Sequence, residues 1–329
     1  MNSSTNYPWH DKTWDQFASA YSQKHLPHAI LLTGPQGVGK YAFSKRLVKS
    51  LLCLNPDSDN LKPCGVCQGC KTYESKANPD YMDIQLLDDK QQIGVDQIRQ
   101  LSEFLTYSRS FDAYRVVLIH PVERMNQNAA NSLLKSLEEP AENTVIILTA
   151  TNLSKVMPTI KSRSQLLTLP MPDKKQAIDW IKQESPNLKD TEELLEMSHG
   201  SPLLAIQTSE DTIEKRNDFA KDILNIVEKN NSVTEVAKKW EKYDLESMLD
   251  WQIIWLQYFL KKTNAPNAHL SQFIIHSNTL KKLEQEILKE QLWGLYQQLI
   301  TKKQTVHTSV NPLINIENML ILWLQASPL

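Results

Sequence analysis

The sequence has no excess of basic charge and few cysteines. Its 329 residues include 36 lysines and arginines against 38 aspartates and glutamates, which gives a formal net charge of −2. A protein that grips nucleic acid alone usually carries a basic excess, because much of its affinity comes from neutralising phosphates. We therefore expect any DNA contact to be shared with partner chains. Four cysteines in a chain of this length do not indicate a disulfide scaffold.

Long apolar segments are also missing. The longest runs, such as Met319–Leu324, are far too short to span a bilayer. The first residues are polar and lack the charged start and apolar stretch of a signal peptide. The rest of the composition is that of a folded protein, with 41% hydrophobic and 22% charged residues. We expect a cytoplasmic protein that does not contact membranes.

Short β-rich runs alternate with helical patterns in the first half of the chain, which predicts a parallel sheet flanked by helices. The five expected strands are Ala29–Thr33, Tyr81–Leu87, Val116–Ile119, Thr144–Thr149 and Leu166–Leu169. The strand signal then disappears, and the pattern is helical from about residue 210 onward. The predicted fold class is α/β, and three domains are expected: a nucleotide-fold domain (1–170), a small helical domain (171–209) and a larger helical domain (210–329).

A glycine-rich turn lies between the first expected strand and a helix. Residues 34–40 read GPQGVGK, the setting of a P-loop, where backbone N–H groups and a helix N-terminus bind phosphates. The candidate phosphate-loop residues are Gly34, Gly37, Gly39 and Lys40. The pattern requires Ser or Thr next, to hold Mg²⁺, and Tyr41 is a poor replacement for a short hydroxyl. We interpret the loop as vestigial; a working loop and a chance glycine-rich turn are the alternatives.

The acidic residues of a P-loop ATPase are also missing. They should follow the strand Val116–Ile119, but the next two residues are His120 and Pro121. Glu123 lies farther on and is expected to be a solvated charge at the entry of a helix. Two parts of the hydrolytic apparatus are therefore absent together, and whether ATP binds without hydrolysis is left open.

All the cysteines fall within one short segment. They are Cys53, Cys64, Cys67 and Cys70, and the last three read CGVCQGC. Two-residue gaps let neighbouring thiolates converge on one ion, and four sulfurs complete a tetrahedral zinc site. Iron–sulfur ligation, a redox pair and free thiols are the alternatives. We predict a structural Zn²⁺ knuckle, inserted at about residues 53–78.

Several short motifs carry a resemblance to a known family. They are YPW at 7–9, HA at 28–29, GVDQIR at 94–99, NSLLKSLEEP at 131–140 and SRS at 162–164. With the loop and the cysteine insertion, they make the chain resemble the delta-prime subunits of bacterial DNA polymerase III clamp loaders, of the AAA+ class, over essentially its whole length. The LLKxLEEP run is highly specific to clamp loaders. The insertion is shared with the loader's motor subunit, which differs in having the catalytic residues.

The resemblance implies an AAA+ P-loop-type sheet domain, a helical lid and an all-helical collar that joins five subunits into a ring. The implied partners are the motor (gamma/tau) and delta subunits, the sliding clamp and, through the assembly, primed DNA. The implied function is loading of the sliding clamp during DNA replication, within a holoenzyme that has DNA polymerase (nucleotidyltransferase) activity. The chain itself is expected to have no activity.

The resemblance also implies a role for Arg163. Relatives carry a Ser-Arg-Cys motif whose arginine reaches the ATP site of the neighbouring subunit as an arginine finger, and Arg163 matches that arginine, although Ser164 replaces the cysteine. The alternative is that Arg163 only pairs with a surface carboxylate. In the lid, the arginine expected after Gly200-Ser201-Pro202 is replaced by Leu203, a third loss from the ATP site.

Two other functions are weighed against this one. An ATP-hydrolysing motor subunit is disfavoured by four residues: Tyr41, His120, Pro121 and Leu203. A stand-alone zinc-bearing nucleic-acid-binding module is disfavoured by the near-neutral charge. The helix N-termini near Asn126 and Val95 face DNA phosphates in the family; simple capping is the alternative at both.

Overall fold

The computed structural model describes residues 6–87, 90–188, 191–207, 210–264, 278–305 and 311–328. The chain forms two compact units, one of residues 1–186 with 200–204 and the other of residues 187–199 with 205–329. The three-domain division remains a prediction, and its boundary at residue 209 lies outside the described residues.

A five-stranded parallel sheet forms the centre of the first unit, which confirms the predicted fold class. The strand order is β2-β3-β4-β1-β5. The strands are β1 (Ala29–Thr33), β2 (Tyr81–Gln85), β3 (Arg115–His120), β4 (Thr144–Ala150) and β5 (Gln165–Thr168). The central strands are buried on both faces, and this is why they read as continuous apolar runs in the sequence. β2 ends two residues before the predicted Leu87.

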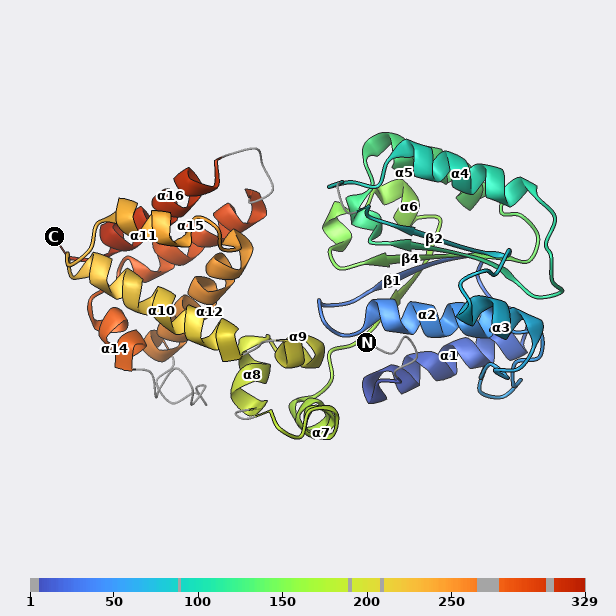
Figure 1. The fold of residues 1–329 in the computed structure, drawn as a ribbon, viewed down its shortest axis with the longest axis horizontal. Helices are drawn as coiled ribbons and strands as arrows, with labels where there is room; N and C mark the ends of the chain where they lie inside the picture. Colours follow the sequence, from blue (N-terminus) through green and yellow to red (C-terminus); the bar gives the residue numbers. More distant parts are fainter. Residues whose placement is uncertain are drawn as a thin grey trace. The chain divides into compact units, whose positions relative to one another are not determined.

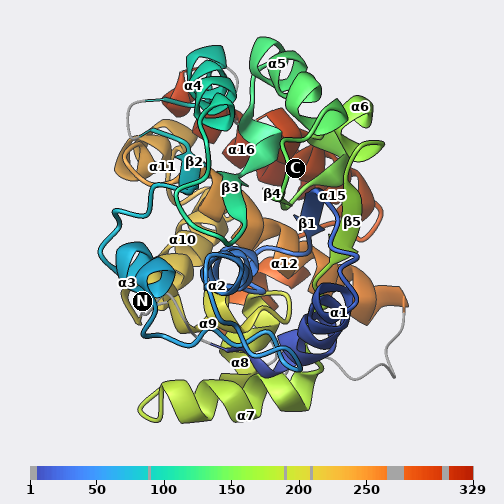
Figure 2. The same ribbon diagram turned by 90° about the vertical axis from the view of Figure 1, so that its right-hand side faces the viewer.

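Helices cover both faces of this sheet (Figure 1). One face carries α4 (Val95–Thr106), α5 (Gln127–Glu138) and α6 (Pro158–Lys161). The other carries α1 (Asp11–Ser22), α2 (Lys40–Leu51) and α3 (Gln68–Glu74). Figure 2 shows the two helical layers on either side of the strands. The helix α7 (Lys174–Glu184) and the 3-10 helices Pro8–His10 (η1), Val122–Arg124 (η2) and Leu153–Lys155 (η3) complete the unit.

The residues at both ends of the helix α5 account for its limits. The Asn126 side chain accepts a hydrogen bond from the Ala129 N–H at 2.8 Å, so Asn126 caps the helix, as the alternative interpretation had it. Leu133 and Leu137 are buried on the face toward the sheet. Glu138 is the last helical residue, shortly before Pro140, which cannot continue a helix.

Within its described residues, the second unit contains helices and no strands. Its helices are α8 (Thr191–Met197), the end of α9 (Pro202–Gln207), α10 (Glu210–Val227), α11 (Val233–Trp240), α12 (Leu245–Asn264), α14 (Asn278–Gln285), α15 (Leu292–Thr305) and α16 (Pro312–Ala326). Large aromatic side chains, among them Trp255, Trp323 and Phe219, fill its core. The buried Gln252 amide satisfies the Trp323 indole by accepting its N–H at 2.5 Å. Within the described residues, no helix has the length and apolar character needed to cross a bilayer.

Candidate functional site

The glycine-rich loop joins β1 to α2, as predicted. Gly34, Gly37 and Gly39 have φ values of 154°, 72° and 88°, a region that residues with a side chain rarely adopt. Lys40 begins α2, and its ammonium group donates hydrogen bonds to the carbonyls of Gly34 and Pro35, both at 2.8 Å. Burial lowers the pKa of Lys40 to about 8, although the nearby Glu123 carboxylate opposes this. The four predicted residues therefore lie together, and the lysine points back into its own loop.

Other segments of the same unit pack directly against this loop. A Cβ atom at Gly37 would lie 2.0 Å from the Ser201 hydroxyl oxygen, and one at Gly39 would lie 2.4 Å from the Tyr7 ring. The loop is therefore in close contact with both neighbours. Its glycines are required by this packing as well as by their φ values.

The 3-10 helix η1 fixes a carbonyl group of the loop. The Trp9 indole N–H and the His10 imidazole both bond to the Val38 carbonyl, at 2.8 and 2.7 Å. Burial lowers the pKa of His10 to about 4, so its ring is neutral at pH 7 and donates one N–H to that oxygen.

The side chains of Tyr41 and His120, at the two positions where the P-loop pattern would require a hydroxyl and an acidic residue, lie against each other. Tyr41 follows Lys40, His120 ends β3, and their ring centroids are 4.8 Å apart with an angle of 33° between the planes. The His120 ring nitrogen Nδ1 also bonds to the Thr149 hydroxyl. Burial lowers the pKa of His120, which disfavours its cationic form. An imidazole and a phenol therefore take the places of a carboxylate and a short hydroxyl.

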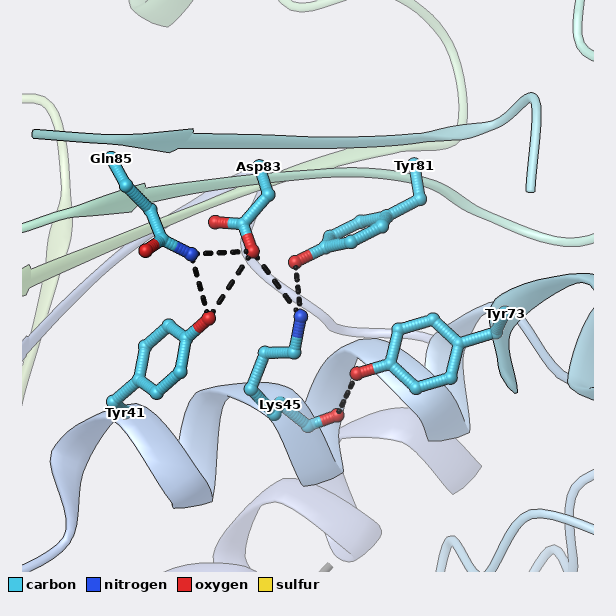
Figure 3. A network of polar contacts seen from close by, with 6 residues as sticks. All are labelled: Tyr41, Lys45, Tyr73, Tyr81, Asp83 and Gln85. Carbon is cyan, nitrogen blue, oxygen red and sulfur yellow. Dashed lines mark hydrogen bonds and ion pairs between the residues drawn. The ribbon is translucent and has the colours of Figure 1, made fainter. Parts of the chain in front are cut away.

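The phenol of Tyr41 belongs to a polar network between α2 and β2 (Figure 3). It donates to Asp83 Oδ2 at 3.3 Å and accepts from the Gln85 amide at 2.7 Å. The Asp83 carboxylate also forms an ion pair with Lys45 at 3.2 Å. Burial raises the pKa of Tyr41 to about 12, so the phenol keeps its proton at neutral pH.

Lys45 extends this network to the cysteine-containing insertion. Its ammonium group lies 4.9 Å from the centroid of the Tyr81 ring and 5.4 Å from that of Tyr73, and it donates to the Tyr81 hydroxyl at 3.0 Å. The Tyr73 hydroxyl, on α3, donates to the Lys45 carbonyl at 3.3 Å. Figure 3 shows these groups converging from α2, β2 and α3. The helix that follows the phosphate loop is thus bonded to the insertion.

The expectation for Glu123 was only partly correct. The residue lies in a short helix, as expected, but it is partly buried rather than solvated. Its Oε1 accepts hydrogen bonds from the N–H groups of Thr151 (2.7 Å) and Asn152 (3.3 Å) after β4, and its Oε2 is buried. The carboxylate is used to hold this turn of backbone.

The four cysteines lie together, as their spacing predicted. All the sulfur atoms of Cys53, Cys64, Cys67 and Cys70 are within 4.8 Å of one another, and those of Cys53 and Cys67 are 3.8 Å apart. Zinc–sulfur bonds of about 2.3 Å in a tetrahedron require sulfur atoms about 3.8 Å apart. The cluster is therefore compatible with a metal ion held by four thiolates.

Backbone N–H groups favour the ionised form of at least one of these thiols. The N–H groups of Leu54 and Cys70 donate to the Cys67 sulfur, each at 3.4 Å. Burial opposes ionisation of Cys67, but these hydrogen bonds, together with those from the Cys70 and Cys64 side chains, outweigh it and lower the pKa of the thiol to about 6. A thiolate is the form that a metal ion requires.

Arg163 lies between α6 and β5, away from the phosphate loop. Its guanidinium group forms an ion pair with Glu138 at 2.6 Å, so the surface carboxylate of the alternative interpretation is present. It also donates to the Thr159 carbonyl at 3.2 Å. The Ser164 hydroxyl donates to the Ile160 carbonyl at 2.9 Å. About one third of the Arg163 side chain is exposed.

Comparison with known proteins places this arrangement in a family. The family model for DNA polymerase III, delta subunit, matches residues 9–173. The chain is 31% identical to the DNA polymerase III subunit delta' of Pseudomonas aeruginosa over 326 residues, which are 96% of this chain and 97% of that protein. The chain belongs to the DNA polymerase III delta' family. The subunit delta' of Haemophilus influenzae is likewise 31% identical, over 80% of each chain.

A more limited similarity connects this delta' family member to another subunit. The DNA polymerase III subunit gamma/tau of Mycobacterium bovis is 36% identical, but only over 139 residues, which are 42% of this chain and 24% of that protein. The similarity to delta' subunits thus extends through both units, whereas the similarity to gamma/tau covers less than half of the chain.

Sequence reasoning missed several residues around the site of this delta' family member. The sequence gives no signal for Asp83 and Lys45, and Glu138 stands in it only as part of the NSLLKSLEEP run. A carboxylate within β2 and a lysine on α2 are ordinary features of a sequence. Only the packing of α2 against the sheet brings them together.

Proposed function

We propose that this chain is a subunit of the DNA polymerase III clamp loader that does not hydrolyse ATP and that supplies Arg163 to the ATP site of a neighbouring subunit. The observation that carries the proposal is the Tyr41–His120 ring pair at the positions of the metal ligands. Phosphoryl transfer depends on Mg²⁺ and on a group that orients the attacking water. Neither ring can bind Mg²⁺ as a carboxylate or a short hydroxyl does.

In this role the chain is a stator for a loader that contains gamma/tau and delta subunits. ATP binding to the motor subunits would tighten a five-membered ring, which holds the sliding clamp open, and primed DNA would trigger hydrolysis and release. A guanidinium group supplied across an interface stabilises charge on the γ-phosphate; in GTPases such an arginine accelerates hydrolysis by about 10³–10⁵-fold. The delta' relatives support this assignment and a cytoplasmic location.

The cysteine cluster is proposed to hold a structural Zn²⁺ ion. Four thiolates would complete the coordination sphere and leave no position for a reactive water. The ion would cross-link the insertion at 53–78 through its four cysteines. Through Tyr73 and Lys45, that insertion would support the helix that follows the phosphate loop.

The helical parts of the chain are proposed to follow the division of the family, with a lid at 171–209 and a collar at 210–329. The buried aromatic core of the second unit would give such a collar its own stability. Contacts with the clamp and with DNA would be made through the assembly, in keeping with the net charge of −2.

The arginine role is tested in a reconstituted loader that carries Arg163→Ala. We expect DNA-stimulated ATP hydrolysis at the adjoining site to fall by about 10³-fold, with little change in subunit association, because the side chain is a partly exposed surface group. Steady-state turnover and gel filtration measure the two quantities. Lys155→Ala, at an exposed cation on the neighbouring 3-10 helix, is the matched control. Loss of assembly, or unchanged turnover, would contradict the role.

The absence of hydrolysis is tested on the isolated chain. Turnover of ATP by the purified protein should equal that of Lys40→Ala, since the lysine has no metal site beside it. Turnover that disappears with Lys40 would mean that the chain is a motor subunit, the alternative function.

A further inference from the structure

Glu138 is the charged partner of Arg163. Its Oε1 lies 2.6 Å from Arg163 Nη2. Glu138 is the last residue of α5 and belongs to the NSLLKSLEEP run. The other terminal nitrogen, Nη1, donates to the Thr159 carbonyl at 3.2 Å and approaches the Ser162 hydroxyl at 3.3 Å. The two terminal nitrogens of the guanidinium group therefore have different partners: Nη2 has a charged one and Nη1 has neutral ones.

Both residues of the pair are attached to fixed backbone. The Glu139 N–H bonds to the Lys135 carbonyl at the end of α5, and the Arg163 N–H bonds to the Ile160 carbonyl at the end of α6. The two helices pack on the same face of the sheet, where Leu133, Leu137 and Ile160 share one buried cluster. The distance between the two side chains is thus set by the core of the unit.

The pair is too exposed to be important for stability. The side chains are 35% and 50% exposed, and ion pairs in such positions contribute little to folding. A long arginine side chain without a partner would populate many rotamers. A carboxylate on one end of the fork restricts these rotamers. It also leaves other N–H groups of the five donors available to an incoming anion.

We infer that Glu138 is a positioning residue for Arg163. It orients the guanidinium group before the neighbouring subunit arrives, so that the group meets the nucleotide without first being ordered. This inference rests on the proposed role of Arg163 in the neighbour's ATP site. Glu138 itself does not contact that nucleotide.

The experiment is a double-mutant cycle in the reconstituted loader, with Glu138→Gln, Arg163→Ala and both together. The glutamine keeps the shape of Glu138 and removes its charge. We expect Glu138→Gln to lower the kcat of DNA-stimulated ATP hydrolysis by about 2- to 5-fold, the range that a half-exposed ion pair supports. The KM for ATP should be unchanged, because ATP is held by the neighbour's own loop. In the Arg163→Ala background, Glu138→Gln should cause no further loss.

Glu139→Gln is the matched control, since it removes the exposed carboxylate next in the chain. It should leave kcat unchanged. If Glu138→Gln lowers turnover equally with and without Arg163, the residue acts on the structure of α5 and the inference is wrong. If Arg163→Ala lowers turnover but Glu138→Gln does not, the positioning role fails and the arginine role stands. If Arg163→Ala has no effect, the proposed function itself fails.

Discussion

The phosphate loop (residues 34–40) and the Arg163 corner, which consists of Glu138 and residues 159–164, belong to the same α/β unit. Polar groups near the loop bond within the unit, whereas those of the corner lie partly exposed. At the loop, Lys40 bonds to carbonyls of its own turn, and Tyr41 bonds to Asp83 and Gln85. At the corner, the Arg163 fork lies partly exposed beside an exposed carboxylate. Polar groups that are satisfied inside a unit hold its fold. Polar groups at its surface remain available to another molecule.

Burial accounts for this difference. Desolvation lowers the pKa of Lys40 and His120 and raises that of Tyr41, so around the loop burial disfavours the charged form of each group. A guanidinium group stays charged under all these conditions. At pH 7 His120 and Tyr41 are therefore neutral, and the Lys40 charge is used inside the loop, whereas the Arg163 charge lies at the surface.

Loss of the proposed zinc ion should show the largest difference between the two regions. Structural zinc contributes on the order of 10 kcal/mol to the folding of small zinc domains, so we expect Cys67→Ser to lose the metal and to loosen the insertion. Hydrogen exchange should then accelerate in α3 and at the start of β2, while the end of α5 keeps its protection. Metal analysis and hydrogen-exchange mass spectrometry measure both effects.

The control for this variant is Val66→Ser, at an exposed position between two of the cysteines. It should keep the metal content and the exchange pattern of the natural chain. Unchanged metal content in Cys67→Ser would refute the four-thiolate site.

Acid should weaken the loop region through His10. The pKa of this buried imidazole is lowered from 6.5 to about 4, so between these values the unfolded chain binds a proton that the folded chain does not. The stabilising contribution is complete above pH 6.5 and is lost as the pH falls toward 4. From pH 7 to pH 5 the free energy of unfolding should decrease by about 2 kcal/mol. Denaturant titration at both pH values measures it.

His10→Gln should remove this part of the pH dependence, whereas His25→Gln, at an exposed position, should keep it. An NMR titration of the His10 ring that gave an ordinary pKa would contradict the explanation, whatever the stability curve showed.

The smallest effect is expected for Tyr41→Phe. The change removes both hydrogen bonds of the hydroxyl group, one donated and one accepted, but keeps the ring against His120. The free energy of unfolding should therefore fall by only about 1 kcal/mol. Thermal unfolding measures the change, with Tyr107→Phe, at a 63% exposed position, as the control. A gain of ATP turnover in Tyr41→Phe would show that the hydroxyl group of Tyr41, and not its aromatic ring, prevents hydrolysis.

The fold was predictable where the sequence pattern is local. The central strands β1, β3 and β4 could be recognised because they are buried along almost their whole length, and the cap at Asn126 because a single side chain forms it. The cysteine cluster was predictable for the same reason, since three of its members share one short segment. Each of these features depends on neighbours in the chain.

Contacts between distant segments could not be predicted in this way. A carboxylate partner for Arg163 could be considered from the sequence, but the packing of α5 beside α6 decides that it is Glu138. Glu123 reads as a surface charge, and it becomes a backbone acceptor only because β3 and β4 end side by side. Tertiary packing determines these roles.

The close packing at Gly37 and Gly39 has a consequence for evolution. Any larger residue at Gly37 would displace Ser201, and one at Gly39 would displace Tyr7. Selection for a stable fold is therefore sufficient to preserve both glycines, even in a lineage that has no use for a nucleotide. A glycine-rich loop of this kind is therefore no evidence of ATP hydrolysis by itself, because the packing of the fold alone requires its glycines.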